Sequence, residues 1–162
     1  MDFKNKKVLI TGGCSGIGKI MARKSLERGA SNLIIWDINE EGLAKTKEEF
    51  ANFGKEISTY KVDVSNLDEI KITAQRVRTE VGKVDILINN AGIVVGKYFH
   101  EHTHEQIQKS LLINTNALMH IALEFLPEMM KENSGAICNI ASSAGLISNP
   151  KMSVYAASKW AV

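Results

Sequence analysis

The stretch VLITGGCSGIGKIMARKSLERGA, residues 8–30, decides how the rest of the chain is interpreted. An apolar, β-branched run typical of a strand leads directly into glycines at positions 12, 16 and 18, and a helical pattern follows at once. Glycine allows a tight turn and a close approach of the backbone to a ligand. The stretch therefore predicts a strand, a glycine-rich turn and a helix in succession.

A turn of this kind suits a diphosphate. The first backbone N–H groups of a helix are free to donate hydrogen bonds, and the positive end of the helix dipole favours an anion. Gly12, Gly16 and Gly18 would leave room for the phosphates, although an ordinary glycine-rich turn remains the alternative for an isolated motif. The position of the motif between a strand and a helix favours dinucleotide binding.

Short apolar runs recur along the chain and alternate with helix-like segments. This alternation predicts an α/β fold, a Rossmann-like doubly wound parallel sheet with helices on both faces. We interpret residues 1–162 as one domain, because the chain is too short for two ordinary ones. The expected strands are 7–11, 32–36, 57–62, 84–88 and 136–140.

Capping signals punctuate the expected helices. Asn39 is expected to cap a helix that ends near Gly54, and Ser65 is expected to open one that ends near Gly82. The sequence THEQ at 103–106 is a capping box that starts a long apolar pattern reaching to about residue 131.

Composition excludes some classes of function. The formal net charge is +2, from 20 basic and 18 acidic residues without a basic cluster, so we expect no nucleic-acid partner. No apolar run approaches the roughly 20 residues of a membrane span, and the short charged start predicts a cytoplasmic protein. Cys14 and Cys138 form no paired motif and are expected to be buried, reduced and non-catalytic.

Asp37 ends the second expected strand, 19 residues after Gly18. A carboxylate at this place can accept hydrogen bonds from both hydroxyls of an adenosine ribose, and it would repel a 2′-phosphate. Neither Ser15 nor Ile38 is basic, so no side chain nearby would neutralise that phosphate. The predicted cofactor is NAD rather than NADP, although Asp37 alone would also suit a strand-end turn.

Three motifs together carry a family resemblance: Thr-Gly-x-x-x-Gly-x-Gly at 11–18, NNAG at 89–92, and Tyr-x-x-x-Lys at 155–159. The chain resembles the short-chain dehydrogenase/reductase family in its compact single-domain form. This resemblance implies a nicotinamide-dependent oxidoreductase that interconverts an alcohol and a ketone or aldehyde. The cofactor-binding residues that the motifs and the resemblance indicate are Gly12, Ser15, Gly16, Ile17, Gly18, Asp37, Asp63, Val64, Asn90, Ala91, Gly92, Tyr155 and Lys159.

The resemblance also implies a catalytic set of four residues. Ser142, 13 residues before Tyr155, matches the family's substrate-orienting serine better than its neighbour Ser143 does. Asn114 matches the asparagine that interrupts the family's long fourth helix and holds a water in a proton relay. Taken singly, these residues could equally serve strand ends, turns or a solvated helix face.

Tyr155 and Lys159 lie four residues apart and would share one face of a helix beginning near Ser153. Moving the pKa of a tyrosine from about 10 to about 7 requires roughly 4 kcal/mol of preference for the phenolate. The Lys159 ammonium and the positive nicotinamide ring could supply it together. The predicted mechanism has Tyr155 as the acid/base, Ser142 on the substrate oxygen, and hydride transfer to or from the nicotinamide.

Members of the family usually continue beyond the point where this sequence stops. We therefore expect residues 1–162 to be the N-terminal part of a longer enzyme, with the last strands missing. The alternatives are a truncated, non-catalytic module that binds NAD or a partner chain, and a relative that acts on nucleotide sugars, against which the glycine spacing argues. The resemblance implies a homodimer or homotetramer at full length. The apolar loops 92–99 and 145–152 hint at a lipophilic alcohol or carbonyl substrate, and NNAGIVVGKYF with EFLPEMM looks similar to relatives that oxidise retinol or hydroxysteroids.

The stretch FHEHTHE, 99–105, brings three histidines together. The capping box at Thr103 divides them between a loop and a helix start, and no fourth ligand is placed beside them. We expect no functional metal site.

Overall fold

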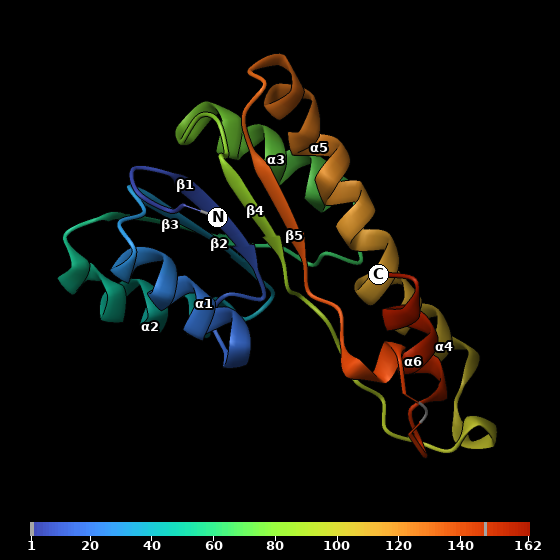
Figure 1. Ribbon diagram of the computed structural model, residues 1–162. Coiled ribbons are helices and arrows are strands. Elements are labelled where there is room, and N and C mark those ends of the chain that lie inside the picture. Colours follow the sequence, from blue (N-terminus) through green and yellow to red (C-terminus); the bar gives the residue numbers. More distant parts are fainter. Residues whose placement is uncertain (1, 148) are drawn as a thin grey trace.

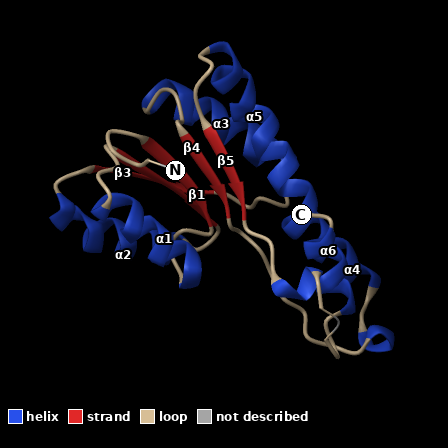
Figure 2. Cartoon of the chain, in the orientation of Figure 1, coloured by secondary structure: helices blue, strands red, loops and turns tan. Residues whose placement is uncertain are grey.

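Five parallel strands form the centre of the computed structural model, which describes residues 2–147 and 149–162. The order across the sheet is β3-β2-β1-β4-β5, so the chain winds first to one side of β1 and then to the other (Figures 1 and 2). The predicted doubly wound α/β fold is confirmed. The strands are β1 (Lys7–Thr11), β2 (Asn32–Asp37), β3 (Glu56–Lys61), β4 (Ile86–Asn89) and β5 (Ala136–Asn139).

Burial explains why these runs form strands. β1 and β2 are buried almost throughout, as expected of central parallel strands covered on both faces, whereas β5 is only half-buried. All five strands agree with the expected ones to within two residues at each end. The largest difference is at β4, which begins at Ile86, two residues after the expected start; the Asp85 side chain just before it accepts from the Lys7 backbone N–H at 2.9 Å.

Helices cover both faces of the sheet. α1 (Gly16–Glu27) and α2 (Glu40–Phe50) lie on one face, while α3 (Leu67–Glu80) and α5 (Ala117–Lys131) lie on the other (Figure 1). Each face has its own apolar core, because alternate side chains of a strand point to opposite sides of the sheet. Helices therefore pack against both faces of the sheet. Because the strands are parallel, their carboxyl ends lie together at one edge.

Most of the predicted helix starts are confirmed. The Asn39 side chain accepts from Gly42 N at the start of α2, and Thr103 forms the predicted capping box of α4 (His104–Leu111). The prediction for α3 was wrong by one residue: Asn66, not Ser65, is its N-cap. The Ser65 hydroxyl instead donates to the Asp63 carboxylate at 2.6 Å, so it is already engaged in the preceding turn.

A π-helical turn, Leu112–Asn116, separates α4 from α5 and thus breaks the long predicted helix at Asn114. α6 (Ser153–Trp160) begins where it was expected and packs beside α4, beyond the carboxyl end of β5 (Figure 2). Short 3₁₀ turns at Ala51–Phe53, Phe99–Glu101 and Ser143–Gly145 complete the described elements. The π-helical turn contacts α6 as well as the two helices that it separates.

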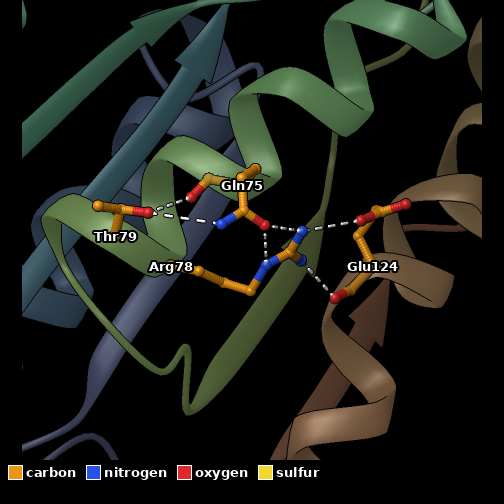
Figure 3. A network of polar contacts seen from close by, with 4 residues as sticks. All are labelled: Gln75, Arg78, Thr79 and Glu124. Carbon is orange, nitrogen blue, oxygen red and sulfur yellow. Dashed lines mark hydrogen bonds and ion pairs between the residues drawn. The ribbon is translucent and has the colours of Figure 1, made fainter.

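A polar link joins α3 to α5 on the second face (Figure 3). The Arg78 guanidinium donates to the Glu124 carbonyl at 2.9 Å and to its carboxylate at 3.2 Å. Gln75, one turn earlier on α3, accepts from the same guanidinium at 3.2 Å and holds its plane in place. Both ends of the Arg78–Glu124 pair are partly shielded from water, so this link fixes the two helices against each other more firmly than an exposed pair would.

Among residues 2–147 and 149–162, no helix combines the length and the apolar character that a membrane crossing requires.

Candidate active site

A cleft of about 340 Å³ opens at the carboxyl ends of β1, β2 and β4. Ligands of open parallel sheets bind at such a place, where the chain leaves β1 toward one side and β4 toward the other. The structure brings together here every predicted cofactor residue outside α6. These are Gly12, Ser15, Gly16, Ile17, Gly18, Asp37, Asp63, Val64, Asn90, Ala91 and Gly92.

The first loop requires glycine at its three positions for different structural reasons. Gly12 and Gly16 have φ angles of +66° and +48°, a region that side chains rarely adopt. A Cβ on Gly18 would lie 2.0 Å from the Gly12 carbonyl oxygen, whereas a Cβ on Gly16 would meet nothing within 4 Å. Gly18 therefore lets α1 pack closely on the loop, and Gly16 leaves open space at the cleft, where a diphosphate fits.

The N-terminus of α1 faces this space. Ser15 is its N-cap residue, is exposed, and makes no capping hydrogen bond with its side chain. The first N–H groups of the helix therefore have no side-chain acceptor from the cap, and the first turn contains no acidic residue. An anion bound here would receive these hydrogen bonds and the field of the helix dipole.

Two backbone groups hold the Asp37 carboxylate. One oxygen accepts from Cys14 N at 3.2 Å and the other from Asn39 N at 3.0 Å. Burial, followed by the adjacent Asp37 carboxylate, raises the pKa of the Cys14 thiol to about 12, so this thiol stays protonated. Asp37 is thus fixed at the rim of the cleft as a hydrogen-bond acceptor, and the thiol beside it adds no charge.

Asp63 is fixed in a similar way at the end of β3. Its Oδ1 accepts from the Ser65 backbone N–H and hydroxyl, and its own N–H donates to the Glu69 carboxylate at 2.8 Å. With Val64 it lines the side of the cleft next to β2 and β3. Glu69 is a supporting residue that the sequence analysis missed, although its position three residues after the Asn66 cap is a capping-box signal.

Thr11 fastens the NNAG segment to the glycine loop, a role that the sequence analysis also missed. Its buried hydroxyl oxygen accepts from the N–H groups of Asn90 and Ala91, both at 3.0 Å. The Asn90 side chain donates in return to the carbonyls of Thr11 and Gly12 at 3.0 and 3.2 Å. The two loops that border the cleft therefore form one unit. A threonine directly before the first glycine was the available signal.

Asn114 connects three parts of the site. Its side chain accepts from Ile93 N at 2.8 Å and donates to Ile93 O at 2.9 Å and to the Ser158 hydroxyl at 2.9 Å. Ser158 is fully buried, and its hydroxyl donates a hydrogen bond to the Tyr155 carbonyl at 2.7 Å. Both side-chain N–H groups of Asn114 are thus engaged by the protein. Ser158 is a further residue that the sequence analysis did not single out.

Lys159 is buried, with 7% of its surface exposed, and its ammonium donates to the Ile140 carbonyl at 2.7 Å. Burial lowers the pKa of this lysine below its usual value. A Cβ on Gly92 would lie 3.7 Å from the Lys159 Nζ and 3.2 Å from the Asn114 Oδ1. The lysine of α6 therefore reaches the border of the cleft from behind the NNAG segment.

Tyr155 and Ser142 lie outside the lining of the cleft. Tyr155 is half-buried near the start of α6, one helical turn before Lys159, and it does not line the 340 Å³ cleft itself. The Ser142 hydroxyl accepts from Ala144 N at 3.2 Å, which leaves its hydrogen free for another acceptor. Ser142 is half-buried, whereas its neighbour Ser143 is exposed.

The histidines near residue 100 have other partners. The ring of His100 stacks on Tyr98, and His102 Nδ1 lies 3.1 Å from the Tyr98 carbonyl. Within the described ranges, 2–147 and 149–162, no group of three or more histidine, cysteine or acidic residues could hold a metal ion.

The family model and the similar sequences indicate the same family. A family model described as short chain dehydrogenase matches residues 6–162. Estradiol 17-beta-dehydrogenase 11 of Pongo abelii is 40% identical over 154 residues, which cover 95% of this chain and 51% of that protein. Retinol dehydrogenase 10-A of Danio rerio is 35% identical over 175 residues, covering 94% and 51%. The chain spans about half the length of the curated relatives it matches.

Solved structures agree. NAD⁺-bound xylitol dehydrogenase superposes with a TM-score of 0.92 at 30% identity, over 99% of this chain and 62% of that one. A metagenomic short-chain oxidoreductase in complex with NADP gives 0.92 at 29% identity, over 99% and 73%. A short chain dehydrogenase/reductase from Burkholderia phymatum in complex with NAD gives 0.93 at 34% identity, over 99% and 57%. Each of these three structures contains bound NAD or NADP.

Proposed function

The chain belongs to the short-chain dehydrogenase family, and we propose that it carries the cofactor-binding and catalytic groups of a nicotinamide-dependent dehydrogenase acting on CH–OH groups. The observation that carries this proposal is the closeness of Lys159 to Gly92: the Lys159 Nζ lies 3.7 Å from the position that a Cβ on Gly92 would occupy. It links the Tyr155–Lys159 helix to the loop that borders the dinucleotide cleft. Because the chain covers about half of each relative, the activity of the whole protein is part of the proposal.

The cleft fits a dinucleotide. The space at Gly16, the free N-terminus of α1 and the fixed carboxylate of Asp37 are arranged in the order in which a diphosphate and an adenosine ribose would follow each other. We assign NAD rather than NADP, because the Asp37 carboxylate would accept from the ribose hydroxyls and repel a 2′-phosphate. The nearest cation on β3, Lys61, is paired with Glu40 at 3.0 Å.

In the proposed reaction Tyr155 takes the hydroxyl proton of the alcohol and, in the reverse direction, returns it to the carbonyl oxygen. Ser142 donates its free hydrogen to the same oxygen and orients it. Lys159 favours the phenolate of Tyr155 by its positive charge, and Asn114 holds the π-helical turn against α6 through Ser158. The nicotinamide, when bound, supplies the hydride acceptor.

The substrate is proposed to be a lipophilic alcohol. Val94 and Phe99, in the segment after NNAG, and Leu146 and Ile147, in the segment after Ser142, expose 54–79% of their surfaces. We propose that these exposed apolar side chains together form a surface that binds an apolar substrate. Two of the relatives are named as dehydrogenases of estradiol and retinol, which are lipophilic alcohols.

We further propose self-association through α5. Met119, Leu123, Leu126 and Met130 lie at helical spacing along this helix and are 38–70% exposed, so they form an apolar stripe directed away from the core. A second copy of the protein is the proposed partner, as a homodimer or as part of a homotetramer. The cytoplasmic location remains a prediction made from the amino-acid sequence.

A non-catalytic binding module is the second candidate. It is favoured by β5, which pairs with β4 alone among the described strands, and by the exposure of Trp160 at 70%. An open strand edge is a place where another chain can add a strand.

The first experiment distinguishes the two candidates. Reduction of NAD⁺ is followed by its absorbance change with a panel of secondary alcohols, for the protein and for Tyr155→Phe, together with calorimetric titration of NAD⁺. Turnover that the variant loses, with NAD⁺ affinity kept, supports the dehydrogenase. Normal NAD⁺ binding without turnover in either protein supports the binding module.

A further inference from the structure

The Asp37 carboxylate belongs to a closed ring of contacts that joins the glycine loop to the start of α2. Cys14 N donates to Asp37 Oδ2 at 3.2 Å, and Asn39 N donates to Asp37 Oδ1 at 3.0 Å. The Asn39 side chain in turn accepts from Gly42 N at 3.0 Å. The ring is completed where Gly42 packs against the Cys14 side chain. The two donors of the carboxylate therefore come from segments whose separation depends on that packing.

Gly42 is glycine because of its neighbours and not because of its backbone. Its φ angle lies outside the left-handed region, so the conformation does not require glycine. Alanine would also have the higher propensity inside a helix. A Cβ at this position, however, would lie 2.8 Å from the Cys14 Sγ and 3.1 Å from the Asn39 side chain. The absence of a side chain at residue 42 therefore makes the space that the thiol occupies.

The Cys14 side chain is fixed in that space. Only 7% of the residue is exposed, and it belongs to the apolar core between the sheet and the helices α1 and α2. The Cys14 carbonyl accepts from the hydroxyl of Thr46, one turn after Gly42 on α2, at 3.5 Å. Because burial and the Asp37 carboxylate raise the pKa of the thiol to about 12, its contact with α2 is between uncharged groups. Helix α2 thus meets the loop at two points, both of them on Cys14.

We propose that Gly42 and Cys14 are positioning residues for Asp37: their contact fixes where α2 lies, and through it the direction of the carboxylate that selects NAD over NADP. The Asp37 side chain is only half-buried, so its direction depends on the two backbone donors. The inference deepens the proposed function and rests on it for the identity of the cofactor.

A displaced α2 would change the site in a defined way. Cys14 N belongs to the loop after β1, whereas Asn39 N belongs to the N-cap of α2. If a larger side chain at residue 42 pushes the helix away from the loop, the Asp37 carboxylate keeps one of these donors and loses the other. The loss then falls on recognition of the adenosine ribose, because the N-terminus of α1, where a diphosphate would bind, is not part of the ring.

Amide hydrogen exchange followed by NMR tests the ring without any cofactor. In the parent protein we expect slow exchange at the N–H groups of Cys14 and Asn39, since both donate to Asp37. Gly42→Ala should speed the exchange of at least one of them by about tenfold, the effect of losing one such hydrogen bond. Gly96→Ala is the matched control, because a Cβ there meets nothing within 4 Å. Equal exchange in the parent protein and Gly42→Ala overturns the proposal.

A double variant tests whether the sulfur is the cause. Cys14→Ala removes the atom that a new Cβ at residue 42 would meet, so Gly42→Ala with Cys14→Ala should recover most of the slow exchange. Cys138, the second free cysteine, lies on β5 and provides the control double variant, Gly42→Ala with Cys138→Ala, which should show no recovery. Exchange that stays fast in both double variants overturns the role of Cys14.

Calorimetric titration of NAD⁺ and NADP⁺ tests the effect on cofactor selection. Gly42→Ala should weaken NAD⁺ binding about fivefold and change NADP⁺ binding by less than about twofold, because only the ribose acceptor is displaced. A purely structural role would weaken both cofactors alike, so an unchanged affinity ratio overturns the proposal. A parent protein that binds neither dinucleotide contradicts the proposed function, whereas the exchange rates by themselves decide whether Gly42 and Cys14 position Asp37.

Discussion

Asn114 donates a hydrogen bond of 2.9 Å to the hydroxyl of Ser158, and this buried contact joins the π-helical turn to the helix that carries Tyr155 and Lys159. Because Ser158 donates onward to the Tyr155 carbonyl at 2.7 Å, the start of α6 is held in place from inside the protein. The Ser158 carbonyl also accepts from Thr115 at 3.0 Å. The candidate catalytic helix is thus aligned by side chains that do not meet a substrate.

Ser158→Ala should therefore lower both stability and turnover. The variant leaves one Asn114 N–H and the Tyr155 carbonyl without their buried partner, which destabilises by about 1–3 kcal/mol. We expect kcat to fall more than KM changes, measured alongside chemical denaturation. Ser153→Ala, an exposed change on the same helix, is the control. Equal kcat in both variants would show that this contact does not align α6.

Gly18→Ala should disrupt the dinucleotide site. The added Cβ would lie 2.0 Å from the Gly12 carbonyl oxygen, so the loop and α1 must move apart. We expect the Kd for NAD⁺ in calorimetry to rise at least tenfold, equivalent to about 1.4 kcal/mol. Gly96→Ala meets nothing within 4 Å and should bind NAD⁺ normally. Similar affinities in the two variants would contradict the assignment of the loop.

Asp37→Ser should reduce the preference for NAD⁺ over NADP⁺. The change removes the acceptor for the ribose hydroxyls and the charge that repels a 2′-phosphate, each an effect of about 1–3 kcal/mol. Titration of both cofactors should show weaker NAD⁺ binding and stronger NADP⁺ binding. Asp85→Ser, a change at a carboxylate away from the cleft, provides the comparison. An unchanged affinity ratio would remove Asp37 as the specificity determinant.

Lys159→Met should alter how stability depends on pH. Burial lowers the pKa of Lys159, so the folded protein gives up this proton at a lower pH than the unfolded chain does. Between these two pKa values the unfolded chain binds more protons, and the stability of the parent protein rises with pH. Relative to Lys159→Met, the free energy of unfolding of the parent should therefore increase as pH approaches the usual lysine pKa. A constant difference between the two proteins across this range would contradict a depressed pKa.

The Arg78–Glu124 pair should contribute more than an exposed pair (Figure 3). Its side chains are 32% and 22% exposed, and the guanidinium also bonds to a backbone carbonyl. A double-mutant cycle with Arg78→Met and Glu124→Gln should give a coupling of about 1 kcal/mol, and the same cycle at the more exposed Arg76–Glu80 pair of α3 should give a smaller one. Equal couplings would mean that water screens both pairs alike.

Much of the fold followed from local patterns. The strands could be predicted because central parallel strands are buried on both faces and read as continuous apolar runs, as Leu33–Trp36 does. Capping at Asn39 and Thr103 was predictable because a cap bonds to backbone only two or three residues away. The exchange of Ser65 for Asn66 as the cap of α3 was not, since both are good caps and Asp63 decided between them by engaging the serine.

The amino-acid sequence by itself determined the alternation of strands and helices, the glycine turn, and which residue types stand at the ends of the strands, because these depend on local periodicity and sterics. Only the tertiary structure decided that Thr11 ties two loops together, that Ser158 joins Asn114 to α6, and that the Asn89 side chain donates to Asn139 on the neighbouring strand. These contacts link residues far apart in the chain. Their partners are chosen by how the sheet and its helices pack, which no local pattern records.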